Sequence, residues 1–156
     1  MFRIFSPAFS EGGPIPRAHT CDAADLSPPL AWSDLPEGTR ELALIVDDPD
    51  APDGTWVHWV FYGISPSVKG LSTGVPREAD LKSPITGKQG VNDFRKVGWG
   101  GPCPPPGAPH RYVFTLYALN ELTKVPPGAT RAVLLEGIRK TTIGEAKLVG
   151  KYGRKG

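Results

Sequence analysis

Cysteine and long apolar runs are scarce in this chain of 156 residues, which has two cysteines, Cys21 and Cys103. Two cysteines do not make a disulfide framework at this length, so we expect both to be free thiols. No apolar run could span a bilayer, and the first residues, MFRIFSPAFSEGG, have no apolar signal-peptide core. The sequence therefore predicts a soluble cytoplasmic protein without stable membrane insertion.

An excess of charge of one sign is also missing. The chain has 18 Lys and Arg against 16 Asp and Glu, a formal net charge of +2. A surplus this small does not indicate nucleic-acid binding. The length fits one domain, residues 1–156, that can bury a full core, and no internal repeat or linker divides it.

Glycine and proline, by contrast, are abundant, with 19 and 18 residues. Residues 98–109, GWGGPCPPPGAP, hold four glycines and five prolines, which exclude a helix or a central strand. We call this segment the glycine–proline loop. Because glycine lets a ligand approach the main chain, we expect the loop to offer clustered N–H groups to an anion. These donors would be the N–H groups of Gly98, Trp99, Gly100, Gly101, Cys103 and Gly107.

Alternating and β-branched segments predict a mainly all-β fold. Only a short loop separates residues 40–48 from residues 56–64, which favours an antiparallel hairpin. Residues 131–140 carry the one good helix pattern, with Thr130 as N-cap. Abundant turns between short strands indicate a sandwich or open barrel with a small helical cover. The other expected strands are residues 2–5, a short one at Trp32, 111–119 and 145–154, with weak signals at 70–75 and 89–93.

The expected hairpin brings ionisable residues to one edge of the sheet. The apolar face of Leu42, Leu44 and Val46 ends in Asp48, and period-two alternation places His58 on a face with Trp56, Val60, Tyr62 and Ile64. Pairing of the two strands would put Asp48 and His58 at the same edge.

His110 stands where the glycine–proline loop enters the next strand, so three separate segments aim Asp48, His58 and His110 toward strand ends. A carboxylate at the end of an apolar strand needs partners, because its burial alone is costly. Such convergence favours a pocket at the sheet edge. The third histidine, His19, lies in a polar segment and is expected to be an exposed bystander.

Three kinds of chemistry are open to Asp48, His58 and His110. They could form a facial metal triad, or a base and its orienting partner for a nucleophile such as Cys103 or Ser27. They could also bind an anion, with histidine donors oriented by Asp48. The anion site is favoured, because the loop adds donors and no further acid or metal ligand.

Several motifs together resemble those of the phosphatidylethanolamine-binding protein family, also called Raf kinase inhibitor-like proteins. They are Asp48-Pro49-Asp50-Ala51-Pro52, Trp56-x-His58-Trp59, and Gly101-Pro102 followed by His110-Arg111-Tyr112-Val113-Phe114. Residues 27–32, SPPLAW, and 146–152 are similar to its bacterial and archaeal branch. The resemblance covers essentially the whole chain.

This resemblance implies a β-sandwich of antiparallel sheets with Greek-key character and an anion pocket without cofactor or metal. It further implies a non-enzymatic binder of phosphate-bearing molecules or phospholipid head groups, which regulates or inhibits kinases or serine proteases. By motif, the ligand-binding residues would be Asp48, Pro52, Trp56, His58, Gly101, Pro102, His110 and Tyr112.

The chain also departs from the eukaryotic members. Only Asp53-Gly54-Thr55 separates Pro52 from Trp56, where those members have a longer insert with an aromatic pocket residue. The C-terminal helix that lies beside their pocket has no counterpart before Gly156. Lipid-head-group selectivity and kinase regulation are therefore less firmly implied than the anion site.

Two further expectations concern shape. The tight reversal between Asp48 and Trp56 favours a cis peptide at Ala51-Pro52. Residues 56–64 are apolar on both faces with only one helix to cover a sheet, which predicts a homodimer near the pocket mouth.

The competing functions are a hydrolase that uses Asp48, His58 and His110 with a metal or Cys103, and an interaction protein with a vestigial pocket.

Overall fold

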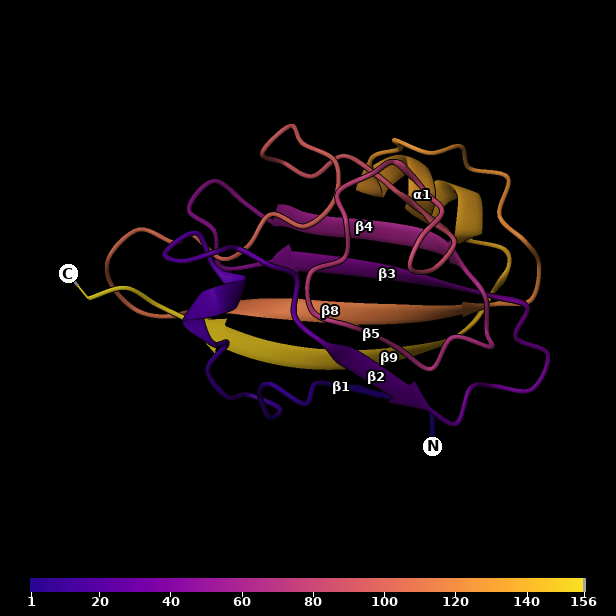
Figure 1. Ribbon diagram of the computed structural model, residues 1–156, viewed down its shortest axis with the longest axis horizontal. Helices are drawn as coiled ribbons and strands as arrows, with labels where there is room; N and C mark the ends of the chain where they lie inside the picture. The colour runs from indigo at the N-terminus through magenta and orange to yellow at the C-terminus, as the bar shows by residue number, and fades with distance from the viewer. Residues whose placement is uncertain (156) are drawn as a thin grey trace.

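The computed structural model describes residues 1–155, which form two antiparallel sheets, one α-helix and one short 3-10 helix (Figure 1). The small sheet has the strand order β1-β2-β5 and the large sheet the order β6-β7-β4-β3-β8-β9. The elements are β1 (Arg3–Phe5), η1 (Arg17–His19), β2 (Leu30–Ser33), β3 (Glu41–Asp48), β4 (Trp56–Ile64), β5 (Gly70–Leu71), β6 (Asp80–Leu81), β7 (Gly87–Gln89), β8 (His110–Leu119), α1 (Arg131–Ile138) and β9 (Thr142–Tyr152).

The large sheet confirms the mainly β fold and the hairpin. Strands β3 and β4 pair antiparallel, with Asp48 opposite Trp56. Strand β8 returns by a long connection and pairs with the other side of β3. The order β8-β3-β4-β7 is that of a Greek key, in which the fourth strand lies beside the first.

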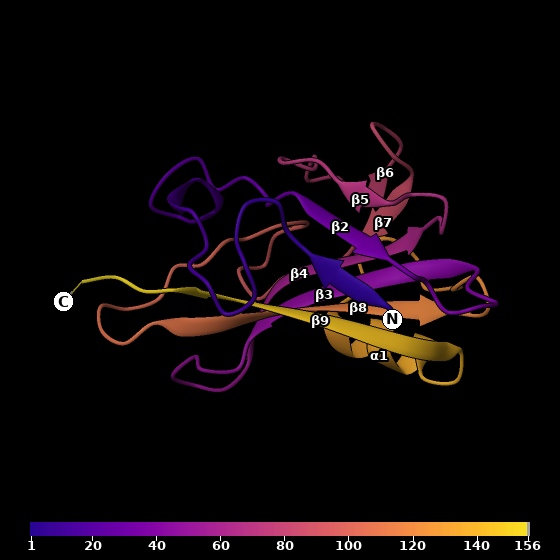
Figure 2. The same cartoon turned by 90° about the horizontal axis from the view of Figure 1, so that it is seen from below.

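Both faces of the large sheet are covered (Figure 2). The small sheet packs on one face over a core that includes Trp59 and Phe114. Helix α1 lies on the opposite face, where Leu134 and Ile138 contact the second core, which includes Tyr62. Thr130 caps α1 as expected, because its Oγ1 accepts a bond from the Val133 N–H at 3.3 Å.

This coverage corrects the premise of the expected dimer. Both faces of β4 are buried within one chain, because the small sheet covers Trp59 and Phe61 while α1 and the segment before it cover Val60 and Tyr62. No uncovered face of β4 therefore calls for a second copy, and the dimer itself stays a prediction.

A β-bulge at His58 breaks the alternation expected of β4. Val46 pairs with Trp59 while Asp47 pairs with Val57, which leaves His58 as the extra residue. Trp59 therefore packs toward the small sheet, and Val60 packs toward α1. The expected single face is wrong, because two irregularities invert the alternation. The extra residue at His58 separates it from the face of Val60 and Tyr62, and a second register shift, between Leu42 and Leu44 of β3, moves Ile64 to the core under the small sheet.

The segment from Ser65 to Lys96 holds three strands of two or three residues each. Strand β5 falls within the weak signal at 70–75, and β7 ends where the signal at 89–93 begins. Strand β5 extends the small sheet, while β6 and β7 extend the large sheet beyond β4. Strands this short contain too few residues for a period-two pattern, so the sequence could not locate them.

Strand β9 forms one edge of the large sheet, and an N-terminal segment pairs with its last part, from Val149 to Lys151. The Gly12 N–H donates to the Val149 carbonyl at 2.7 Å. The Ile15 N–H donates to the Lys151 carbonyl at 2.8 Å, and the Lys151 N–H donates to the Gly13 carbonyl at 2.9 Å. The side chain of Glu11 accepts from the Val149 N–H at 2.9 Å. Residues 11–15 therefore satisfy main-chain groups that an open edge would expose.

Candidate functional site

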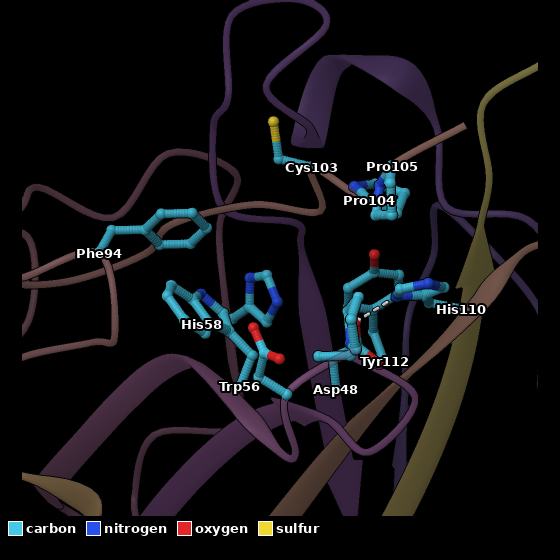
Figure 3. Close-up of a pocket in the computed structure, with 12 residues that line it drawn as sticks. Asp48, Trp56, His58, Phe94, Cys103, Pro104, Pro105, His110 and Tyr112 are labelled. Carbon is cyan, nitrogen blue, oxygen red and sulfur yellow. Dashed lines mark hydrogen bonds and ion pairs between the residues drawn. The ribbon is translucent and has the colours of Figure 1, made fainter. Parts of the chain in front are cut away.

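A pocket of about 200 Å³ lies where β3, β4 and β8 meet the glycine–proline loop (Figure 3). The face of the sheet that carries Val46 and Phe114 continues into it, so the pocket is the polar end of the main core. Six of the eight residues implied by the motifs line it. The lining residues are Asp48, Ala51, Pro52, Asp53, Trp56, His58, Phe94, Cys103, Pro104, Pro105, His110 and Tyr112.

Asp48 and His110 form the polar centre of the pocket. The Nδ1–H of His110 donates to Oδ2 of Asp48 at 2.6 Å, and the two side chains are 13% and 5% exposed. The other carboxylate oxygen, Oδ1, accepts from the Asp50 N–H at 2.7 Å. Asp48 therefore has the partners that its burial demands, and it fixes the ring of His110 with Nε2 as the nitrogen left to meet a ligand.

His58 lines the pocket from the bulge of β4. Its Nδ1–H donates to the Gly100 carbonyl at 2.6 Å, which assigns the proton of the neutral ring to Nδ1. Burial lowers the pKa of His58 below its usual value, because the charged ring is poorly solvated there. Neutral His58 is therefore an acceptor at Nε2, and it becomes a donor to an anion only when it is protonated.

Aromatic rings complete the walls. The rings of Tyr112 and Phe94 approach the His58 ring edge-on, at centroid distances of 5.1 and 5.5 Å. Trp56 contacts Phe94 at 5.4 Å, and each is 37% exposed at the pocket rim. Burial raises the pKa of the Tyr112 hydroxyl far above its usual range, so this group stays protonated.

The loop after β3 is held by Arg111. Its guanidinium donates to both carboxylate oxygens of Asp50, at 2.9 and 2.8 Å, and its main-chain N–H donates to Oδ2 at 2.9 Å. These bonds lower the pKa of Asp50 to about 2. Ala51 and Pro52 on the same loop line the pocket.

The expected cis peptide at Ala51-Pro52 is wrong. Among residues 1–155 the one cis peptide is Ser83-Pro84. The reversal is made instead by a turn in which the Gly54 N–H donates to the Ala51 carbonyl at 3.2 Å, with Gly54 at φ +108°. Glycine tolerates this positive φ, so the chain reverses without a cis bond.

The expected cluster of free N–H groups in the glycine–proline loop is largely wrong. Four of the six donors are used within the protein. Gly98 donates to Gly90, Gly100 to the His58 carbonyl, Gly101 to Asp25 Oδ1 and Gly107 to the Arg154 carbonyl. Turn-rich backbone must satisfy its own polar groups when it packs, and this leaves at most the N–H groups of Trp99 and Cys103 for a ligand.

Gly101 and Pro102 lie behind the pocket wall and do not line it. A Cβ on Gly101 would collide with Oδ1 of Asp25 and with the His19 carbonyl. The motif glycine therefore allows close approach of the main chain to residues 19–25. Pro102 is buried, and its carbonyl accepts from the Cys21 N–H at 3.1 Å.

The expectation of free thiols is wrong in this structure, where a disulfide joins Cys21 to Cys103 across 82 residues of sequence. The close approach that Gly101 permits brings residues 19–25 against the loop.

The expectation that His19 is exposed is also wrong. Its side chain is 5% exposed, and its Nδ1 forms a hydrogen bond with the Leu26 carbonyl at 2.9 Å. A polar segment that packs against the glycine–proline loop encloses it.

Sequence reasoning missed other lining residues. Phe94 lies in the turn-rich segment that gave little signal, and Pro104 and Pro105 were read only as part of a stiff loop. Ala51 and Asp53 complete the additions, while Cys103, which the sequence offered as a loop donor and a candidate nucleophile, also lines the pocket. The one sequence signal that could have indicated Phe94 was an aromatic residue within a polar, turn-rich segment, because aromatic residues are enriched at binding surfaces.

The arrangement of the side chains bears on the three kinds of chemistry that the sequence left open. Within residues 1–155 no group of three or more His, Cys, Asp or Glu side chains has an arrangement suited to a metal ion. Cys103 is in a disulfide, and Ser27 accepts from the Val75 N–H at 2.8 Å outside the pocket. The pocket therefore offers two oriented imidazoles and no nucleophile among the candidates named from the sequence.

Comparison with known proteins agrees with this fold. Residues 5–153 match the family described as phosphatidylethanolamine-binding protein. The chain belongs to this family. A UPF0098 protein of Methanothermobacter thermautotrophicus is 46% identical over 147 residues, which cover 94% of this chain and 95% of that protein.

Two further members of the phosphatidylethanolamine-binding protein family are informative. The crystal structure of the homolog CT736 from Chlamydia trachomatis superposes with a TM-score of 0.89 at 39% identity, covering 99% of this chain and 98% of that chain. Mycobacterium tuberculosis LppC, named as a lipoprotein, is 43% identical over 96% of this chain and 71% of its own length. None of the helices formed by residues 1–155 has the length and apolar character that a membrane crossing needs.

Proposed function

We propose that the protein binds a small oxyanion or a phosphate-bearing molecule in this pocket, without catalysing a reaction. The observation that carries the proposal is the pair of histidines, His58 and His110, which line one pocket from β4 and β8. Each Nδ1 is bonded to a protein acceptor, Gly100 O or Asp48 Oδ2, so each Nε2 is left for a ligand.

Asp48 supports the proposal through His110. The carboxylate accepts from the Nδ1–H of His110 at 2.6 Å and so leaves Nε2 for the ligand. The Nε2–H of a charged imidazole is a charge-assisted donor to a phosphate or sulfate oxygen. Asp48 itself would repel an anion, so the ligand is expected on the far side of the His110 ring.

The test is calorimetry with sulfate and phosphate on the His110→Ala variant. A charge-assisted hydrogen bond is worth about 1.5–3 kcal/mol, so the affinity should fall at least tenfold. Tyr117→Phe is the matched control, because Tyr117 lies on β8 but packs on the α1 side of the sheet. Equal affinities of the wild type and His110→Ala would exclude this site.

A hydrolase is the less favoured alternative. It would need a nucleophile or a metal ligand in addition to Asp48, His58 and His110, and Cys103 is unavailable while the disulfide stands. The present geometry supports binding, since both histidines are already oriented by protein acceptors. Turnover of a generic phosphate ester that Asp48→Asn abolishes would favour the enzyme.

The partners follow from the same chemistry. We propose a phosphate-bearing small molecule or a phospholipid head group as ligand, with a kinase or a serine protease as protein target, and no nucleic acid. Competition between phosphate and a protein target would separate a functional pocket from a vestigial one.

The exposed rim of Trp56 and Phe94 supports a homodimer at the pocket mouth, which light scattering at micromolar concentration tests.

We propose the cytoplasm as the location. The match covers 95% of the Methanothermobacter relative and 71% of LppC, which is named as a lipoprotein. In mesophiles, disulfides of cytosolic proteins are usually transient and redox-sensing. A cytoplasmic location therefore requires that the disulfide between Cys21 and Cys103 can be reduced and re-formed. Fractionation of native cells tests the location.

A further inference from the structure

The disulfide joins two exposed cysteines at the back of the pocket. Cys21 follows η1, and Cys103 stands in the glycine–proline loop directly before Pro104 and Pro105. Cys103 and both prolines line the pocket. Figure 3 shows the sulfur of Cys103 pointing away from the histidines, so the bond can be attacked without a reagent entering the pocket.

The hydrogen bonds that hold the glycine–proline loop are denser before Cys103 than directly after it. Before Cys103, Trp99 Nε1–H donates to the His19 carbonyl at 3.3 Å and Gly101 donates to Asp25 at 2.9 Å. After Cys103 come three consecutive prolines, which have no N–H to donate. The next main-chain donor bond is that of Gly107, to the Arg154 carbonyl at 3.0 Å. Beside the wall at Pro104 and Pro105, two ties join the loop to the segment after η1. They are the disulfide and the hydrogen bond from the Cys21 N–H to the Pro102 carbonyl at 3.1 Å, and the disulfide is the covalent one.

The surroundings of the disulfide suit thiol exchange. A hollow of about 490 Å³ on the other side of the loop is lined by Cys21 and Cys103, among others. The guanidinium Nη2 of Arg154 lies 3.0 Å from Cys21 Sγ and 3.6 Å from Cys103 Sγ. It is held there by Asp22, at 2.5 Å from Oδ1. A cation next to a sulfur stabilises the thiolate that exchange releases.

We infer that Cys21–Cys103 is a reversible redox-modification site whose co-reactant is a small thiol, and that its state sets the position of the pocket wall and so the affinity for the anion. The inference rests on the proposed function for its anion readout. The oxidised form holds Pro104 and Pro105 in place and binds the anion more tightly than the reduced form.

The exchange is balanced as follows. An external thiolate attacks Cys103 Sγ, a mixed disulfide forms, and Cys21 leaves as a thiolate beside Arg154. A second external thiolate attacks the external sulfur of the mixed disulfide and releases Cys103 as a thiolate. Two thiols are oxidised to one external disulfide, the protein disulfide gains two electrons, and the two thiolates take up protons from the solvent.

Sulfate calorimetry on the oxidised protein and on protein kept reduced with dithiothreitol tests the inference. Reduction should weaken sulfate binding about three- to tenfold. The double variant Cys21→Ser with Cys103→Ser is the matched control: its affinity should equal that of the reduced wild type and should not respond to dithiothreitol. Equal affinity of the oxidised and reduced wild type would overturn the inference, as would two free thiols in protein equilibrated with oxidised glutathione.

A second readout does not depend on the anion. Amide hydrogen exchange measured by mass spectrometry should quicken in peptides that cover residues 99–110 on reduction, while peptides of β3 stay protected. If neither redox form binds sulfate, the proposed function fails, and the exchange data alone decide whether the disulfide holds the wall; unchanged exchange overturns that claim.

The role of Arg154 can be measured separately. Arg154→Gln should slow reduction by dithiothreitol several-fold, because the departing Cys21 thiolate loses its cation. Lys151→Gln, on β9 but away from the sulfurs, is the control and should leave the rate unchanged. An unchanged rate in Arg154→Gln would show that the guanidinium does not assist the exchange.

Discussion

At the scale of single residues, the two pocket histidines differ in what binds them. His110 is paired with a carboxylate, whereas His58 is paired with a main-chain carbonyl and its pKa is lowered by burial. Protonation of His58 in the folded protein therefore needs a lower pH than protonation of the same ring in the unfolded chain. This difference links anion binding to stability.

The first residue-scale prediction concerns pH. Below the ordinary histidine pKa of about 6.5, the unfolded chain binds a proton at His58 before the folded protein does, so the free energy of unfolding should decrease as the pH falls from 7 to 5. Sulfate affinity should rise over the same interval, because protonated His58 donates to the anion. Denaturation and calorimetry measure both effects. His58→Gln should remove the contribution of His58 to each effect; a flat profile in the wild type would contradict the assignment.

At the scale of elements, alternation along the strands predicted the site well where the strands are regular. Strand β3 delivers Asp48 on the expected face, and β8 delivers His110 and Tyr112. The bulge at His58 was invisible, because a bulge is set by pairing between strands and leaves no mark in the spacing of one strand. The pocket position of His58 was nevertheless correct, since it depends on the edge of the sheet.

The loop after β3 gives an element-scale prediction. Arg111→Gln should let the pKa of Asp50 rise from about 2 toward its ordinary value near 3.8, as an NMR titration of the carboxyl group would show. The stabilisation from the lowered pKa is present above pH 3.8 and is lost as the pH falls through 2. The difference in stability between variant and wild type should therefore be largest at pH 6 and much smaller at pH 2, where Asp50 of the folded wild type is half protonated. A difference of the same size at pH 6 and pH 2 would assign another role to Arg111.

At the scale of the whole molecule, the disulfide was the largest feature that the sequence could not predict. Two cysteines 82 residues apart become neighbours only through the packing of residues 19–25 against the glycine–proline loop. The same packing encloses His19 and uses the Gly101 N–H, one of the loop donors that were expected to be free. Long-range contacts between irregular segments have no periodic pattern, so composition gives no indication of them.

The disulfide also predicts a change in global stability. Crosslinks of this span stabilise folded proteins by about 2–4 kcal/mol, mainly by restricting the unfolded chain. In the double variant Cys21→Ser with Cys103→Ser, the free energy of unfolding should fall by an amount in this range, which urea unfolding would show as a lower midpoint. The wild type is measured without reductant for comparison. The reduced wild type should match the variant. A loss of stability below roughly 0.5 kcal/mol, far under the typical 2–4 kcal/mol, would contradict the prediction.

The pairing of residues 11–15 with the edge strand β9 bears on the order in which the molecule is made. The edge is formed by the last strand along the chain and is covered by one of the first segments to be synthesised. Ribosomes add about 5–20 residues per second, so the early segment waits several seconds for its partner. A nascent chain that stops before β9 would leave both the early segment and the outer side of β8 without partners. Such a fragment exposes unpaired main-chain groups to quality-control proteases, whereas the finished protein hides them.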